Sequence, residues 1–228
     1  MEGVDIHSLP FDVPTQISKD NGRHLVVGLR AGINRDTRDS FLTPSTGSLL
    51  DVGVEQVLGD YQFPVATAEF TRFFTLHQAR DGGWKGILAS RTSFTAMADD
   101  APVFERVFAG GFRSLRGFQF RGVGPVGTGP LGSQYHTGGT FAMLSTLEYQ
   151  LPLVANERVS FVAFCDYGTV GNRVSFDNFR ATVGVGARLK IPGMGPLPIA
   201  IDFGFPVKQA PTDVKQVFSF YVGWIGGQ

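Results

Sequence analysis

Long segments in which apolar and polar side chains alternate constrain this sequence more than any other feature. In the clearest of them, residues 180–190, the odd positions are apolar and the even positions are small, polar or cationic. A β-strand points successive side chains to opposite faces, so this pattern predicts a strand with one apolar face. The same period predicts nine strands, at about residues 23–34, 48–59, 65–76, 84–95, 140–151, 159–167, 180–190, 197–205 and 216–225.

The length of these segments favours strands that cross a membrane. Most have 9–12 residues, whereas strands of soluble proteins average about 5–6 residues and strands that cross a bilayer need about 9–11. Their apolar face is often the larger one: residues 23–34 place five apolar side chains on one side, Leu25, Val27, Leu29, Ala31 and Ile33. Aromatic residues gather near strand ends, as in the girdles of membrane barrels. We therefore predict an all-β fold, a transmembrane antiparallel β-barrel whose lumen is lined by Arg180, Arg188 and Lys190.

A soluble ligand-binding β-barrel is the alternative that this periodicity leaves open. Such a barrel also alternates, with its apolar face turned inward. Its strands would be shorter, and its outer face would carry more Lys and Glu. Charged residues make up 18% of this chain, against about 25% in soluble domains. The low charge favours the membrane barrel.

Composition and motifs argue against several other classes of function. The chain has 20 basic and 20 acidic residues, whereas a nucleic-acid-binding protein normally carries a basic excess. The single cysteine, Cys165, allows no internal disulfide, and the four histidines have no metal-ligand spacing. The G-x-G-x-x-G matches at 122–127 and 127–132 contain prolines and precede no predicted helix, so they do not indicate a dinucleotide site. We expect no enzyme activity, no cofactor and no metal.

The predicted strands divide the chain into an N-terminal segment, residues 1–22, and a barrel domain, residues 23–228. The first residues are acidic and short of apolar side chains, which does not fit a signal peptide. One connection, about residues 96–139, is far longer than the others, and loops above about 12–15 residues are usually functional or disordered. It carries phenylalanines that a solvated linker would lack, Phe104, Phe108, Phe112, Phe118 and Phe120. We expect this loop to fold into the barrel lumen.

Four blocks of sequence carry a family resemblance. The long loop contains Gly110-Gly111, Leu115-Arg116-Gly117-Phe118 and Val123-Gly124-Pro125. The other blocks are the turn segment Asn34–Gly47, the strand segment Leu147-Glu148-Tyr149, and Phe164-Cys165-Asp166-Tyr167-Gly168. In this order and spacing they resemble the outer-membrane assembly-factor family, the BamA-like bacterial surface antigens. That family typically has sixteen strands behind periplasmic repeat domains, so the resemblance implies that these nine strands are the C-terminal portion of such a barrel.

The alternation of the strands predicts what the loop meets in the lumen. Glu148 lies between two side chains of the lipid face and therefore points inward, and the next strand points Asp166 inward by the same argument. Arg116 is the natural partner, because a guanidinium binds a carboxylate bidentately and stays charged. Gly117 would let the backbone approach the wall, and Phe118 would anchor the loop by packing. The resemblance implies that this contact holds the loop inside the barrel; the alternative is that both acids are ordinary lumen residues.

The resemblance also implies a function, the insertion or assembly of outer-membrane proteins in a bacterial outer membrane. No covalent chemistry is needed, because an open edge at the last strand, about residues 216–225, offers unpaired backbone groups to a client strand. This seam strand carries Phe218, Phe220 and Trp224. The partners implied are the lipid bilayer, client outer-membrane proteins and accessory assembly subunits. The alternative within the same superfamily is a secretion pore that exports one dedicated partner.

Overall fold

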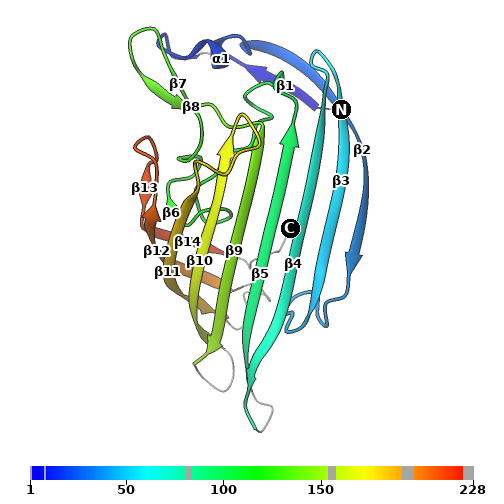
Figure 1. The fold of residues 1–228 in the computed structure, drawn as a ribbon, viewed down its shortest axis with the longest axis vertical. Helices are drawn as coiled ribbons and strands as arrows, with labels where there is room; N and C mark the ends of the chain where they lie inside the picture. Colours follow the sequence, from blue (N-terminus) through cyan, green and yellow to red (C-terminus); the bar gives the residue numbers. More distant parts are fainter. Residues whose placement is uncertain (1, 8, 81–83, 154–157, 192–197, 223–228) are drawn as a thin grey trace.

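A computed structural model gives the structure of the protein and describes residues 2–7, 9–80, 84–153, 158–191 and 198–222. Ten strands form one sheet in the order β1-β2-β3-β4-β5-β9-β10-β11-β12-β14, with antiparallel neighbours throughout (Figure 1). Their bounds are Glu2–Ile6 (β1), Gly22–Asp36 (β2), Gly47–Gly59 (β3), Phe63–Gln78 (β4), Lys85–Met97 (β5), Phe141–Pro152 (β9), Val159–Gly171 (β10), Arg180–Leu189 (β11), Ile199–Lys208 (β12) and Phe218–Val222 (β14). The predicted all-β antiparallel fold is confirmed.

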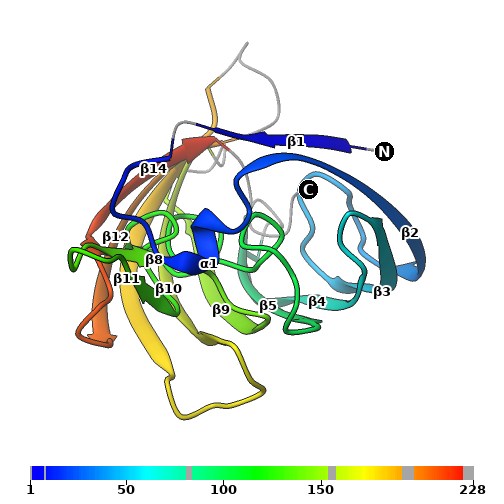
Figure 2. The same cartoon turned by 90° about the horizontal axis from the view of Figure 1, so that it is seen from above.

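The sheet is strongly curled. Seen from above, it is a C-shaped wall around the long connection between β5 and β9 (Figure 2). Among the described residues, the two edge strands β1 and β14 do not pair with each other, so the hydrogen-bond ladder is open there. One short helix, Thr15–Ser18 (α1), precedes β2. No helix in the described part of the chain is long and apolar enough to cross a membrane.

The structure differs from the predicted strands at the two ends of the chain. Glu2–Ile6, which fell outside the nine predicted strands, pairs as β1 with the start of β2. A segment of five residues is too short to show a clear alternation. Its strand conformation comes from its pairing with β2. The last predicted strand, 216–225, is divided. Lys215–Gln216 (β13) leaves the main sheet, Phe218–Val222 alone pairs with β12, and residues 223–225 lie outside the described part.

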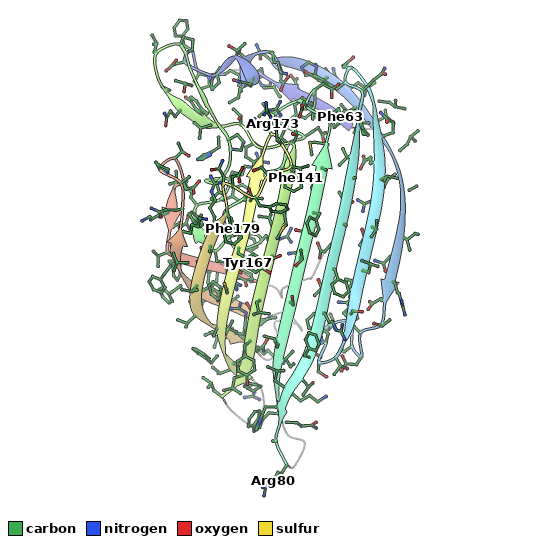
Figure 3. All side chains as sticks on the ribbon, viewed as in Figure 1. Phe63, Arg80, Phe141, Tyr167, Arg173 and Phe179 are labelled. Atoms are coloured by element: carbon green, nitrogen blue, oxygen red, sulfur yellow. The ribbon has the colours of Figure 1, made fainter. Side chains whose placement is uncertain are left out.

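The two faces of the wall differ in character. Along β10 the lumen-facing Val162 and Asp166 are buried, whereas Phe161 on the opposite face is exposed. The outer face carries a band of exposed apolar side chains from strand after strand, including Leu29, Ile33, Val52, Val54, Phe70, Phe94, Leu147, Val185, Phe203 and Phe220. Two aromatic pairs join strands of the wall to the β10–β11 connection, Phe141 with Phe176 and Tyr167 with Phe179. Figure 3 shows Phe141 above Phe179 and Tyr167. A continuous apolar band suits a lipid environment.

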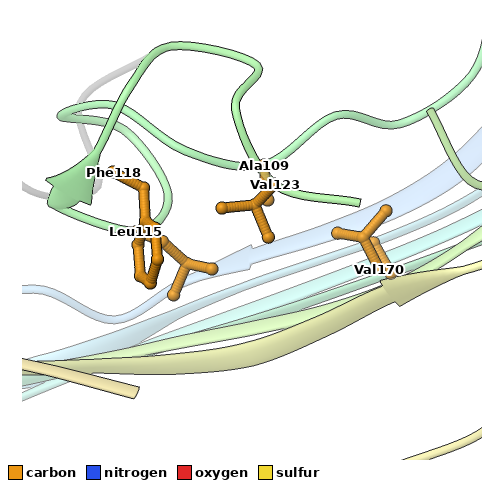
Figure 4. Packing of buried hydrophobic residues seen from close by; sticks show 6 residues of the cluster. Ala109, Leu115, Phe118, Val123 and Val170 are labelled. Carbon is orange, nitrogen blue, oxygen red and sulfur yellow. The ribbon is translucent and has the colours of Figure 1, made fainter. Parts of the chain in front are cut away.

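The long connection between β5 and β9 folds back into the concave side of the wall, as the sequence predicts. It contains three short strands, Gly117–Phe118 (β6), Val126–Thr128 (β7) and Gln134–His136 (β8). Its apolar residues Leu115, Phe118 and Val123 are fully buried and pack against Ala142 and Val170 of the wall. Figure 4 shows this cluster between the loop and the barrel strand. The loop therefore forms a core of its own with the inner face of β9 and β10.

The phenylalanines of the loop do not all lie inside. Three are buried or half-buried, Phe104, Phe108 and Phe118. Phe112 is 40% exposed and Phe120 is 70% exposed. The expectation that these rings avoid solvent is therefore wrong for Phe120. The chain reverses beside it, where Arg121 has a φ of 58°, and the Phe120 ring lies 5.5 Å from the Arg121 guanidinium instead of in the cluster.

Candidate functional site

Five charged side chains and one tyrosine meet where the tip of the loop touches the wall. Arg116 comes from the loop, directly before β6. The others occupy lumen-facing positions on neighbouring strands, from β9 to β14: Glu148, Asp166, Arg188, Asp202 and Tyr221. The sheet order places these strands side by side, so residues far apart in the sequence form one cluster, here called the lumen network.

The Arg116–Asp166 contact is bidentate. Arg116 Nε donates to Asp166 Oδ2 at 2.8 Å, and Arg116 Nη2 donates to Asp166 Oδ1 at 2.8 Å. The backbone N–H of Arg116 donates to the same carboxylate at 3.1 Å. Paired parallel hydrogen bonds of this kind fix orientation as well as distance. The Asp166 carboxylate thus holds both the side chain and the backbone of the loop at this point.

The remaining donor of Arg116 joins it to two more carboxylates. Arg116 Nη1 donates to Glu148 Oε2 at 2.6 Å and lies 3.3 Å from Asp202 Oδ2. A second guanidinium, Arg188, bridges the same two acids, donating to Glu148 at 2.9 Å and to Asp202 at 2.6 Å. The Tyr221 hydroxyl donates to Asp202 Oδ2 at 3.2 Å. The contact between loop and wall therefore continues from β9 to the last strand.

The lumen network is almost dry. The side chains of its two arginines and three acids are at most 6% exposed. Burial lowers the pKa of Arg116, but the nearby carboxylates of Asp166 and Glu148 outweigh it and hold that pKa well above its ordinary value. The Arg116 guanidinium is thus charged at any physiological pH. Removing one partner from such a buried network typically costs about 3–5 kcal/mol, because it leaves a charge without compensation.

An aromatic ring forms the floor of the network. The Arg116 guanidinium carbon lies 3.5 Å from the centre of the Phe164 ring, which adds a cation–π contact. A Cβ at Gly184, the cross-strand neighbour of Phe164, would overlap that ring. Glycine at 184 therefore leaves the space in which Phe164 lies under the arginine.

Glycine also brings the loop backbone onto the wall. Gly117 has a φ of +91°, a conformation that side chains with a Cβ rarely adopt. On the wall, a Cβ at Gly204 would lie 2.7 Å from the backbone N of Gly117. At this contact the two backbones approach without a side chain between them. The predicted close approach at Gly117 thus needs a second glycine, Gly204, on β12.

The loop also pairs with the segment that leads into the last strand. Gly117–Phe118 (β6) is antiparallel to Lys215–Gln216 (β13). The backbone N–H of Gln119 donates to the carbonyl of Val214 at 2.8 Å, and that of Val214 donates to the carbonyl of Gly122 at 2.9 Å. Residues 214–216 therefore pair with the loop and not with the main sheet.

The other predicted site residues have separate positions. Gly110 and Gly111 have φ values of +103° and +90° and form the turn that precedes the Arg116 segment. Gly168 lies on β10, where a Cβ would overlap the backbone carbonyl of Met143. Phe218 and Phe220 are exposed at 49% and 58% on the outer face of β14, away from the network. The remaining seam residue, Trp224, lies outside the described residues.

The predicted lumen arginines take different partners. Arg188 joins the lumen network, whereas Arg180 forms a bidentate pair with Asp213 at 3.0 Å in the β12–β14 connection. Neither Asp202 nor Tyr221 was predicted from the sequence. Asp202 could have been found, because it is the one acid of the predicted strand 197–205 and lies between two apolar residues, Ile201 and Phe203.

Comparisons with known proteins find relatives that match most of this chain. The family model of the Omp85 superfamily domain matches residues 7–224. The outer membrane protein assembly factor BamA of Nitratidesulfovibrio vulgaris is 26% identical over 221 residues, which cover 92% of this chain and 26% of that protein. BamA of Neisseria meningitidis serogroup B is 26% identical over 224 residues, covering 84% of this chain and 28% of its own length.

Two further matches extend the range of relatives. The SAM50-like protein CG7639 of Drosophila melanogaster is 28% identical over 247 residues, covering 98% of this chain and 54% of that protein. The crystal structure of BamA from Haemophilus ducreyi lacking POTRA domains 1-3 has the same fold, with a TM-score of 0.74 and 21% identity over 85% of this chain and 41% of that one. The chain spans about a quarter of the length of the BamA relatives.

Proposed function

The chain belongs to the Omp85 superfamily, and on that premise we propose that it is the barrel portion of an assembly factor that inserts proteins into a bacterial outer membrane. The observation that carries the proposal is the lumen network, which ties an in-folded loop to the wall through Arg116. Similarity to two BamA proteins supports the assembly role over export of a dedicated partner. The partners are the bilayer and unfolded outer-membrane proteins, and the work is non-covalent.

The lumen network would act as a lock on the position of the loop. Arg116 is the only member that the loop contributes among the described residues, so its contacts with Asp166 and Glu148 set whether the loop tip lies against the wall. A locked tip holds β13, and through β13 the start of the last strand. The state of the loop would in this way control the last strand.

The last strand would supply the template for a client. β14 pairs with β12 on one side, and its other side makes no ladder with described residues. Unpaired N–H and C=O groups at a strand edge can accept another chain by β-augmentation. We propose that an incoming client strand pairs there before it moves into lipid.

The test compares Arg116→Ala with Arg113→Ala in the 228-residue chain, folded into phospholipid vesicles. Arg113 lies three residues away on the same loop and makes no ion pair within the described residues. The client is a urea-unfolded eight-stranded outer-membrane barrel, and its insertion is read from the heat-dependent shift of its band on a gel. We expect Arg116→Ala to slow insertion strongly while its own barrel keeps its far-ultraviolet circular dichroism, and Arg113→Ala to insert at the wild-type rate.

The contrary result is equally clear. If Arg116→Ala inserts the client as fast as wild type while protease cleaves its loop more readily, the loop is released but does not control assembly. Arg116→Lys separates charge from geometry, because lysine keeps the charge and loses the bidentate contact. We expect the lysine variant to behave like the alanine variant.

A further inference from the structure

Two arginines on the outer face of the wall, Arg35 and Arg72, lie near the connection between β2 and β3, residues 37–46. Arg35 follows Ile33 on the outer face of β2, and Arg72 follows Phe70 on the outer face of β4. Arg35 pairs with Leu50 of β3, and Arg72 pairs with Ser48 of the same strand. The two side chains therefore flank β3 in adjacent rows, at the end of the wall opposite the long loop (Figure 1).

These arginines line one open pocket with hydroxyl groups. The pocket has a volume of about 550 Å³, and its outer-face lining is Arg35, Thr37, Thr46, Ser48, Arg72 and Phe74. The Thr37 and Ser48 hydroxyls lie 3.1 Å apart. The Arg72 guanidinium lies over the Phe74 ring at 4.8 Å. The pocket thus presents two cations and three hydroxyls at the lower margin of an apolar surface.

Neither cation has an acidic partner in the part of the chain that the structure describes. Within the described residues, Arg35 and Arg72 make no ion pair, whereas Arg30, on the lumen face of β2, pairs with Asp51 at 2.9 Å. An arginine on the lipid face of a barrel is costly at the bilayer centre and tolerated near the interfaces. Two unpaired arginines at the margin of the apolar band therefore call for a ligand that brings its own negative charge.

We propose that this pocket binds the phosphate headgroup of an anionic phospholipid. The long loops of outer-membrane barrels lie on the side opposite the periplasm. The long connection between β5 and β9 is at the other end of the wall, which places the pocket at the periplasmic leaflet. Guanidinium groups bind phosphate oxygens bidentately. The Thr46 and Ser48 hydroxyls supply further donors, whereas the Thr37 hydroxyl donates to the Ser48 carbonyl at 3.1 Å. The acyl chains would lie along the exposed apolar residues directly above, Ile33, Val52 and Phe70. Because the pocket adjoins the lipid-facing apolar band, we infer that its ligand is a membrane lipid and not a soluble anion.

Native mass spectrometry of the detergent-solubilised chain tests this site. Dioleoylphosphatidylglycerol and dioleoylphosphatidylcholine are titrated separately onto wild type, onto Arg35→Gln/Arg72→Gln, and onto Arg30→Gln/Arg173→Gln. The last variant loses the same charge at positions away from the pocket. We expect wild type and the control to retain phosphatidylglycerol in preference to phosphatidylcholine, and the pocket variant to lose that preference with an affinity on the order of tenfold weaker.

Two other outcomes of the titration overturn the proposal. Equal loss in both double variants means that net charge, not the pocket, attracts the lipid. Displacement of phosphatidylglycerol by millimolar inorganic phosphate means that the pocket takes the free anion. If the double variant does not fold, Arg35→Gln and Arg72→Gln are measured singly, each with an expected loss of about threefold; no loss in either contradicts the site. The client-insertion rate is read separately, so this result does not depend on the assembly function.

Discussion

At the scale of single residues, the lumen network depends as much on missing side chains as on charged ones. Arg116 reaches Asp166 and Glu148 only because the loop backbone lies directly on β12. Gly117 and Gly204 meet at that contact, and each would place a Cβ against the backbone of the other. Charge explains why the parts attract, and glycine explains why they come close enough to form hydrogen bonds.

The substitution Gly204→Ala tests this point. Its Cβ would lie 2.7 Å from Gly117 N and 2.8 Å from the carbonyl carbon of Arg116, so the loop tip has to move. We expect a loss of about 1–3 kcal/mol in the free energy of unfolding, the usual effect of overpacking. Urea titration of the barrel in vesicles gives this value.

The matched control is Gly171→Ala, whose Cβ would meet its nearest atom at 3.6 Å, an ordinary contact. That variant should be unchanged or slightly more stable, because alanine restricts the unfolded chain. If both alanine variants unfold at the same urea concentration, the close approach at Gly204 contributes nothing to stability.

At the scale of elements, the last strand is held by the loop as well as by its neighbour. β14 pairs with β12 over five residues, Phe218–Val222. From the inside, the Phe112 ring of the loop stacks on Tyr221 with 4.7 Å between the ring centres and 18° between their planes. The segment before β14 pairs with the loop as β13. A strand this short would be weakly held by one ladder alone, so the loop is part of what orders it.

Phe112→Ala should loosen the last strand without unfolding the wall. An aromatic pair contributes about 0.5–1.5 kcal/mol beyond the area that it buries. Amide hydrogen exchange in the peptide that covers Phe218–Val222 should therefore rise by roughly two- to tenfold. Exchange in β3 and β4, which the loop ring does not touch, should stay constant.

Phe120→Ala is the control for that experiment, because Phe120 belongs to the same loop and is 70% exposed. It should leave exchange in β14 unchanged. Equal acceleration by both variants would mean that the loop as a whole, rather than the Phe112–Tyr221 stack, protects the strand. If neither variant accelerates exchange, the Phe112 ring does not help to order β14.

At the scale of the whole molecule, the two faces of the wall suit different environments, lipid outside and water inside. Its outer face is an apolar band, and its inner face is charged and partly filled by the loop. The filling is uneven: lumen-facing residues of β10 are buried under the loop, whereas most of β2 is exposed on both faces. The lumen beside β2 is therefore not filled by the loop.

Val54→Arg and Thr67→Arg distinguish the two faces. Val54 is 60% exposed on the outer face of β3, and Thr67 faces the lumen on the neighbouring β4. In vesicles we expect Val54→Arg to lower the free energy of unfolding by about 2–4 kcal/mol, the effect of an arginine near the bilayer midplane. Thr67→Arg should change it little, because the loop does not fill this part of the lumen and the new side chain meets water. Equal stability of the two variants would mean that the outer face meets water.

Much of this protein follows from the sequence alone. The alternation of residues 180–190 and of its counterparts predicted the strands, because period two fixes which side chains share a face. The same parity predicted that Glu148 and Asp166 point inward, and the guanidinium chemistry of Arg116 supplied their partner. Local periodicity therefore determined most of the long strands and their faces, and the chemistry of arginine and carboxylate supplied one set of lumen contacts.

Only the tertiary structure decided the rest. Asp202 and Tyr221 join the network because the curl of the sheet brings β12 and β14 around to the loop. Lys215–Gln216 leaves the predicted last strand because the loop offers it a second ladder. Gly204 lies opposite Gly117 because the loop folds back onto β12. Each of these facts is a contact between segments distant in sequence, and alternation within one segment carries no information about which distant segment it will meet.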